Sequence, residues 1–126
     1  MMFGITLEDI QWESCEWTAP DGKVVPFEQA DITDVLIGME TDRWQDDPMI
    51  DVTITRWPRK VVIACIITEG IDGYTSGGDG DGVIFEPIWA TKHTLVTTDR
   101  ATLERDFDRI LDIASNALYD IRSNLP

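Results

Sequence analysis

The sequence is poor in the residues on which several protein classes depend. It contains two cysteines, Cys15 and Cys65, which lie far apart and form neither a disulfide framework nor a C-x-x-C motif. The longest uninterrupted apolar run, residues 61–67, is much shorter than the ~20 residues of a membrane-spanning helix. The first residues lack the basic and apolar stretches of a secretory signal. We therefore expect a soluble globular domain in which Cys65 is a small buried apolar residue.

Basic residues are also scarce, because 10 Lys and Arg face 24 Asp and Glu, for a net charge of −14. Such a charge repels phosphate backbones and anionic lipid, so we expect neither sequence-specific nucleic-acid binding nor a membrane partner. Asp outnumbers Glu, and only three of the basic residues are Lys. This composition resembles that of proteins from salt-loving organisms, in which molar salt screens charge repulsion beyond ~3 Å. An acidic mesophilic protein is the alternative.

The clearest predicted element is a helix over residues 99–122. Its apolar residues recur with a 3.6-residue period, which indicates one buried face with Leu111 at its middle and Asp108 opposite. Thr98 or Asp99 is suited to the N-cap, and Arg122 to the negative end of the helix dipole. The apolar stripe consists of Leu103, Phe107, Ile110, Leu111, Ala114, Ala117, Leu118 and Ile121.

Upstream of this helix the period falls to two, which predicts strands. Residues 50–54 alternate as in a half-buried strand, and residues 60–68 form a more fully buried one. The two flank a turn at Pro58, so we expect an antiparallel hairpin. Residues 83–89 and 91–97 are predicted as two further strands, the first at an edge or a bulge because Pro87 interrupts it.

The first third of the chain has weaker patterns. Residues 3–7 and 24–27 are predicted as short strands around a turn at residues 19–22. Residues 32–39 fit a helix or a strand, and we expect a strand because β-branched and Gly residues surround it. The predicted fold is a single α+β domain over residues 1–126. It has a mainly antiparallel sheet of five or six strands, with one long C-terminal helix packed on a face.

A glycine-rich segment, residues 69–82, contains six Gly and three Asp. Asp and backbone oxygens suit a calcium loop, but the ligand spacing does not match one. A phosphate-binding loop is excluded because no Gly-Lys-Ser/Thr follows. The glycines favour a long, flexible hairpin loop, and we predict that residues 75–82 of it serve as an arm that contacts a partner. A metal-dependent hydrolase that uses Asp72, Asp79 or Asp81 is an alternative.

Residues for catalysis are few. His93 is the only histidine, and neither a Gly-x-Ser-x-Gly elbow nor a local cysteine-nucleophile motif is present. Chance pairs of carboxylates are unavoidable among 24 acidic residues. We therefore predict a protein that is not an enzyme, with no catalytic residue, no metal and no cofactor, and we expect His93 to be an ordinary strand residue.

Tryptophan and arginine occur together at two places, and both are common anchors of protein interfaces. The basic cluster at residues 56–60 would fit the acidic surface of a neighbouring copy. The predicted interface residues are Arg43, Trp44, Arg56, Trp57, Arg59, Lys60, Ser76, Asp79 and Asp81.

In its size, its salt-adapted composition and its strands followed by a long helix, the chain resembles small neck or tail proteins of haloarchaeal tailed viruses, of the tail-completion or tail-terminator type. The resemblance implies a non-enzymatic structural subunit of the virion, assembled in the host cytoplasm. Its partners would be copies of itself in a ring and neighbouring virion proteins. Such families often begin with a helix, which residues 3–7 do not predict. The alternative is a small cytoplasmic binding or regulatory domain of a halophilic cell.

Overall fold

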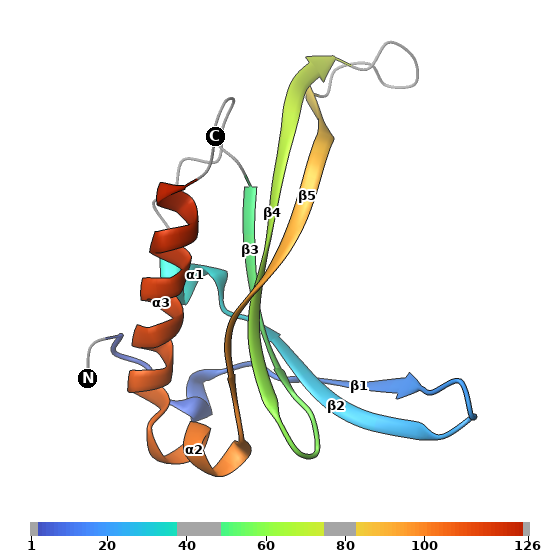
Figure 1. Ribbon diagram of the computed structural model, residues 1–126, viewed down its shortest axis with the longest axis vertical. Coiled ribbons are helices and arrows are strands. Elements are labelled where there is room, and N and C mark those ends of the chain that lie inside the picture. The colour runs from blue at the N-terminus through green and yellow to red at the C-terminus, as the bar shows by residue number, and fades with distance from the viewer. Residues whose placement is uncertain (1–2, 38–48, 75–82, 125–126) are drawn as a thin grey trace.

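The computed structural model describes residues 3–37, 49–74 and 83–124. Five strands form one antiparallel sheet in the order β1-β2-β3-β4-β5, and a C-terminal helix covers one face (Figure 1). The predicted α+β class is thereby confirmed. The elements are η1 (Leu7–Asp9), β1 (Glu13–Thr18), β2 (Val24–Asp31), α1 (Thr33–Ile37), β3 (Met49–Arg56), β4 (Val61–Tyr74), β5 (Val83–Thr98), α2 (Arg100–Arg105) and α3 (Phe107–Ser123).

The hydrophobic core lies between the sheet and α3. Alternate residues of β3 and β4 point to this side, as the two-residue period of a strand requires. Leu111 is fully buried at the middle of the helical stripe, as predicted. The core comprises Ala30, Ile32, Ile50, Val52, Ile54, Val61, Ile63, Cys65, Ile67, Leu95, Leu103, Phe107, Ile110, Leu111, Ala114 and Leu118.

The predicted C-terminal helix is divided in two. Asp106, with φ −125° and ψ 39°, ends α2 and precedes α3. Asp99 is the N-cap of α2, and its carboxylate accepts a hydrogen bond from the Thr102 amide at 2.7 Å. Hydrogen bonds from Thr102 lower the pKa of Asp99 below its usual value. Asp108 is half-buried rather than on a free face, because its carboxylate accepts a hydrogen bond from the Phe3 amide at 3.2 Å.

The predicted hairpin of residues 50–68 is confirmed. β3 and β4 pair from Met49 opposite Thr68 to Arg56 opposite Val61, and the Trp57 amide donates to the Lys60 carbonyl at 2.8 Å in the turn. The two strands expected over residues 83–97 are one strand, β5, at an edge of the sheet. A register shift next to Pro87 confirms the predicted irregularity there.

A second register shift changes which residues of β5 share a face. Ile63 pairs with Val96 and Ala64 pairs with Thr94, so Leu95 is an extra, buried residue between them. Lys92 and Thr94 lie on the groove side of the sheet, opposite Ile66 and Ala64. Val96, which would share their face in a regular strand, lies opposite Ile63 and packs against the core. The strict alternation expected over residues 91–97 is wrong because a bulge interrupts the pleat.

The N-terminal predictions are partly wrong. Residues 3–7 do not form a strand; the 3-10 helix η1 begins at Leu7, with the Thr6 amide donating to the Asp9 carboxylate at 2.7 Å. Strand β1 was not predicted, because its polar sequence lacks alternation. The strand at residues 24–27 and the turn at residues 19–22 are confirmed. In this turn the Gly22 amide donates a hydrogen bond to the Ala19 carbonyl, and Gly22 adopts φ 86°, a conformation that favours glycine.

Residues 33–37 form helix α1, so the strand expected over residues 32–39 is wrong; residues 38 and 39 lie outside the described residues. The Asp31 carboxylate accepts hydrogen bonds from the amide and hydroxyl of Thr33, which turns the chain out of β2. The Thr33 hydroxyl in turn accepts a hydrogen bond from the Val52 amide at 2.9 Å. This polar contact with β3 outweighs the local β propensity.

Both ends of the sheet continue into two-stranded ribbons (Figure 1). The β4–β5 ribbon pairs residues 69–74 with residues 83–89, beyond the last β3 pair at Met49 and Thr68. The β1–β2 ribbon pairs residues 15–18 with residues 24–27, beyond the first β3 pair at Glu28 and Arg56. Within the described part of the chain, neither ribbon pairs with a third strand.

Candidate interaction surface

The sheet face opposite α3 contains a groove of about 550 Å³. The strand residues that form its floor alternate with the buried core residues, so their side chains point away from the helix. Short side chains, four of them Thr, separate longer ones. The lining residues are Phe27, Gln29, Thr53, Thr55, Trp57, Lys60, Val62, Ala64, Ile66, Lys92, Thr94 and Thr97.

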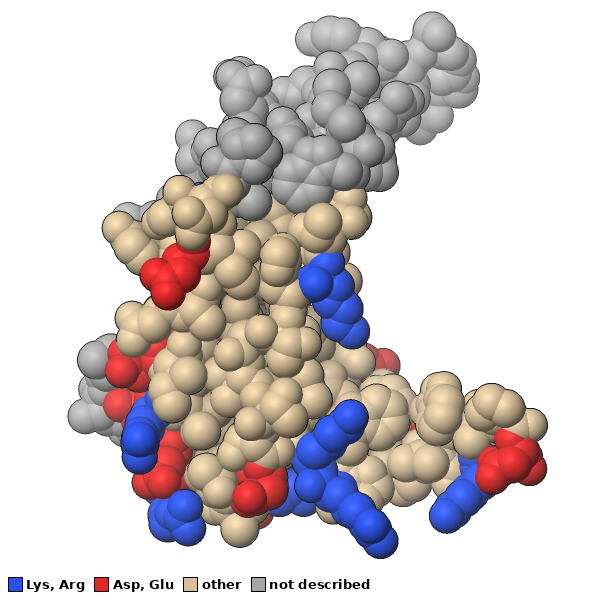
Figure 2. Space-filling model, viewed as in Figure 1, with Lys and Arg blue, Asp and Glu red and all other residues tan. Residues whose placement is uncertain are grey.

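The groove is basic on an otherwise acidic protein. Two of the three lysines of the sequence, Lys60 and Lys92, line it, and both are exposed. Among the described residues, three exposed carboxylates share this sheet face outside the groove lining: Glu13 opposite Gln29, Asp31, which is hydrogen-bonded to Thr33, and Asp51, which has an interaction of its own. Figure 2 shows basic side chains between the two ribbons, and acidic side chains interspersed with basic ones along the helical side. The lining of the groove is thus positively charged, and carboxylates lie around it on the same face.

One wall of the groove is aromatic. Trp57 stacks on Phe27 with the ring centroids 4.3 Å apart and the planes at 30°. Of the predicted interface residues, Trp57 and Lys60 thus line the groove, and Arg59 is exposed in the turn between them.

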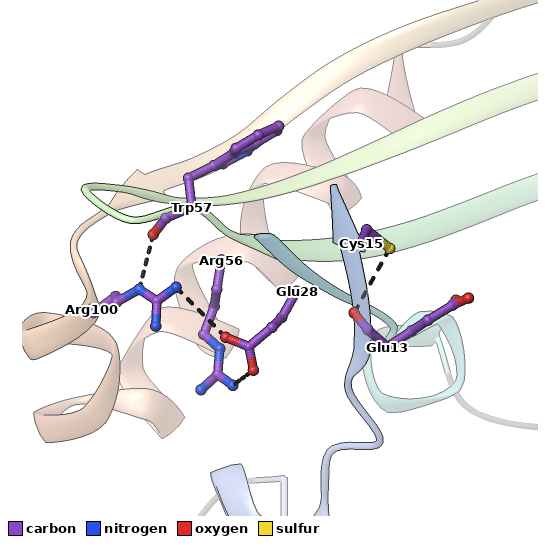
Figure 3. A network of polar contacts seen from close by, with 6 residues as sticks. All are labelled: Glu13, Cys15, Glu28, Arg56, Trp57 and Arg100. Carbon is purple, nitrogen blue, oxygen red and sulfur yellow. Dashed lines mark hydrogen bonds and ion pairs between the residues drawn. The ribbon is translucent and has the colours of Figure 1, made fainter. Parts of the chain in front are cut away.

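Arg56 has a different position from its neighbours in the predicted basic cluster. Its guanidinium lies 3.7 Å above the Trp12 ring. It also lies 2.6 Å from the Glu28 carboxylate (Figure 3). Arg100 also approaches Glu28, at 3.6 Å, and donates to the Trp57 carbonyl at 2.9 Å. The carboxylate of Glu28 thus connects β2, β3 and α2, and holds the β1–β2 ribbon at the lower end of the sheet.

Replacing Glu28 by Gln is expected to lower the free energy of unfolding by about 1–3 kcal/mol. The Arg56 side chain is only 18% exposed, so its charge would lose its carboxylate without gaining full access to water. Urea unfolding measures the change. The matched control, Glu16→Gln on the exposed side of β1, should have little effect, and equal losses in both variants would contradict the role given to Glu28.

Within the described residues, His93 on β5 and the nucleophilic side chains of β1 lie on opposite edge strands of the sheet. Ser14 and Cys15 are among the residues that line a second groove of about 740 Å³ along the β1–β2 ribbon, whereas His93 lies on β5 opposite Cys65. Cys65 is fully buried, as predicted, and burial raises the pKa of its thiol. Within residues 3–37, 49–74 and 83–124, no three His, Cys, Asp or Glu side chains are grouped to hold a metal ion.

The outward side of α3 exposes two large apolar residues that the sequence analysis did not select. Tyr119 is 70% exposed and Ile113 is 42% exposed. Both fall outside the buried stripe of the helix. An apolar residue outside this 3.6-residue pattern is the feature of the sequence that could have indicated an exposed apolar surface. Arg43, Trp44, Ser76, Asp79 and Asp81, also predicted as interface residues, lie outside the described residues.

Comparison with known proteins does not assign the chain to a family. In the part of the chain that the structure describes, no helix has the length and hydropathy to cross a membrane. Searches of protein-family models, curated proteins and solved structures found no significant match to this chain.

Proposed function

We propose that this protein is a non-enzymatic structural subunit that assembles with copies of itself into a ring, as a neck or tail-completion protein of a tailed virus particle does. The observation that carries the proposal is the extension of one small sheet into two ribbons. In the described residues, these ribbons gain no support from a third strand.

A two-stranded ribbon is marginally stable by itself in water, and both its edges carry unpaired backbone groups. The β4 side of the β4–β5 ribbon, residues 69–74, extends roughly 20 Å at the usual rise of a strand. A neighbouring subunit that packs against the ribbon would supply the missing contacts. Function through assembly therefore accounts for a feature that an isolated domain does not need.

The charge of the chain bears on how the subunits meet. A net charge of −14 opposes association, so contacts between copies require local positive surface or screening by salt. Arg59, Lys60 and Lys92 provide exposed positive charge. In the proposed setting the ring contacts neighbouring virion proteins, and assembly takes place in the host cytoplasm.

Light scattering in molar salt tests the proposal directly, and we expect the mass of a multi-subunit ring. A monomer at all concentrations would contradict the proposal and favour a small cytoplasmic binding domain instead. Retention of a metal ion after dialysis would favour the hydrolase that uses Asp72, Asp79 or Asp81.

Replacing residues 76–81 by a two-residue turn is expected to leave the subunit folded and to weaken assembly. The segment lies between β4 and β5 in the sequence, and its Asp79 and Asp81 suit a basic neighbouring surface. Circular dichroism checks the fold, and light scattering measures the assembly. Normal assembly of the shortened chain, together with loss of calcium binding in calorimetry, would contradict the contact and support a metal site.

A further inference from the structure

We propose that two copies of this chain pair through the free edge of β1, as antiparallel strands in which Cys15 of one copy lies opposite Cys15 of the other. This inference rests on the proposed function, self-assembly, and names the surface through which the β1–β2 ribbon gains a third strand. The pairing is two-fold, so it joins copies in twos, and a ring of such pairs needs a second contact elsewhere.

The edges of the sheet differ in whether a further strand can add to them. Pro26 and Pro87, which have no amide to donate, interrupt the free edges of β2 and β5, and the bulge at Leu95 interrupts β5 again. The free edge of β4, residues 69–74, contains two glycines and a register shift at Gly70. Among the described edge and ribbon strands, β1 alone is uninterrupted, and it pairs with β2 along its whole length. Strand addition between two copies therefore joins β1 to β1.

The free edge of β1 is exposed, and the hairpin shows which backbone groups point to it. Five of the six β1 residues are exposed, and the ribbon extends away from α3 (Figure 1). The Ala19 amide donates to the Lys23 carbonyl at 2.7 Å, so every second residue back along β1 from Ala19 bonds to β2. The amides and carbonyls of Ser14 and Glu16 therefore point to the free edge. Pro26, opposite Glu16, has no amide to bond with it, as this assignment requires.

The pleat limits how two β1 strands can align. Residues directly opposite each other in antiparallel strands share a face, so under two-fold symmetry the strands align about one residue that faces its own counterpart. Alignment about residue 14 or residue 17 would pair only residues 13–15 or 16–18 of β1. Alignment about Cys15 or Glu16 pairs nearly the whole strand, residues 13–17 or 14–18.

Like charges decide between the two longer alignments. Alignment about Glu16 would set the Glu16 carboxylates of the two copies directly opposite each other, which destabilises a pair of strands. Alignment about Cys15 sets Glu16 opposite Ser14 and Glu13 opposite Trp17, so no two acidic residues of the paired strands are directly opposite. Molar salt screens the remaining repulsion between two acidic copies.

The pairing brings the two Cys15 thiols within reach of a disulfide. The backbone of Cys15 bonds to β2, so across the new contact the two Cys15 residues form a non-hydrogen-bonded pair, in which the Cα atoms are ~4.5 Å apart. A disulfide spans ~4.4–6.8 Å between Cα atoms. Cys15 is a free, half-buried cysteine, whereas Cys65 is fully buried in the core. Oxidation of the folded protein therefore reports on Cys15.

Oxidation with diamide in molar salt tests the register. Two Cys15 thiols transfer two hydrogen atoms to the azo group of diamide and form one disulfide, so we expect a dimer on a non-reducing gel that dithiothreitol reverses. Cys15→Ser should give no dimer. In the Cys15→Ser background, Glu13→Cys and Trp17→Cys should each remain monomeric alone and crosslink when mixed, because residue 13 faces residue 17. Crosslinking of this Trp17→Cys variant to the unchanged chain would place Cys15 opposite residue 17 and overturn the register.

Glu16→Pro tests the backbone contact. It removes an amide that points to the free edge and no hydrogen bond to β2, and edge strands tolerate such a proline. The crosslink at Cys15 should be lost, with the circular dichroism spectrum unchanged. Glu16→Gln, the matched control, keeps the amide and should crosslink at least as well as the unchanged chain. Where Glu16→Pro does not fold, Ser14→Pro, which removes an amide that points the same way, replaces it.

Light scattering separates this inference from the proposed function. A Cys15 crosslink that Glu16→Pro abolishes, together with a mass that stops at the dimer, would support the inference and contradict the ring. A larger assembly that shows no Cys15 crosslink, and that Glu16→Pro leaves unchanged, would overturn the inference and keep the proposed function. A monomer without a crosslink would contradict both.

Discussion

Replacing Leu111 by alanine is expected to lower the free energy of unfolding by about 2–5 kcal/mol. Leu111 is fully buried at the middle of α3, in the core shared with β3 and β4. The substitution removes apolar contacts and leaves a cavity that the flanking helix and sheet can fill only in part. Urea unfolding followed by circular dichroism measures the loss.

Glu104→Ala is the control for this prediction, because Glu104 is exposed at the end of α2. Its effect should be smaller than about 0.5 kcal/mol. Asp108 is unsuitable as a control, since its carboxylate binds the Phe3 amide. Losses of similar size at Leu111 and Glu104 would show that the buried side of the C-terminal helices is assigned incorrectly.

The fold is expected to be substantially more stable in molar KCl than in dilute buffer. The 24 acidic residues outnumber the 10 basic ones, and their mutual repulsion is relieved on unfolding. Molar salt shortens the screening length to ~3 Å, so most of this repulsion disappears from the folded state. The melting temperature measured across a salt series gives the effect.

A variant with fewer acidic residues distinguishes the screening of charge repulsion by salt from a general strengthening of apolar burial by salt. Glu13, Glu16 and Glu104 are exposed, and their replacement by Gln should raise stability in dilute buffer and narrow the difference between the two salt conditions. A melting temperature in dilute buffer equal to or above that in molar salt would contradict the salt-adapted interpretation of the composition.

The elements that could be predicted from the sequence are those whose pattern is local and regular. The stripe around Leu111 and the alternation in residues 50–54 each have one strong period, and both elements are present. Strand β1 could not be predicted because five of its six residues are exposed and only Cys15 is half-buried. Its sequence therefore lacks the alternation of apolar and polar residues that indicates a strand. Helix α1 escaped because contacts of Thr33 with β3, nineteen positions away, decide its conformation.

The candidate surface was predictable in part for the same reason. Trp57 and Lys60 stood out as an aromatic and a basic residue close together, and both line the groove. Arg56 belonged to the same cluster in the sequence, yet its partner Glu28 is 28 positions away. No local pattern indicates that pairing. Tyr119 and Ile113 were passed over because apolar residues outside a stripe are common on protein surfaces.

The bulge at Leu95 has a consequence for how β5 can change in evolution. If strict alternation continued from the pair of Val62 and Thr97, Lys92 would stand opposite the buried Ile67. The extra residue places Lys92 opposite Ile66 instead, and loss of Leu95 would keep this pairing. A one-residue deletion at position 95 would thus preserve the face on which Lys92 lies, at the cost of one buried core side chain. An alignment that forbids gaps within strands would exchange the two faces of β5 and wrongly assign the groove lysine to the core.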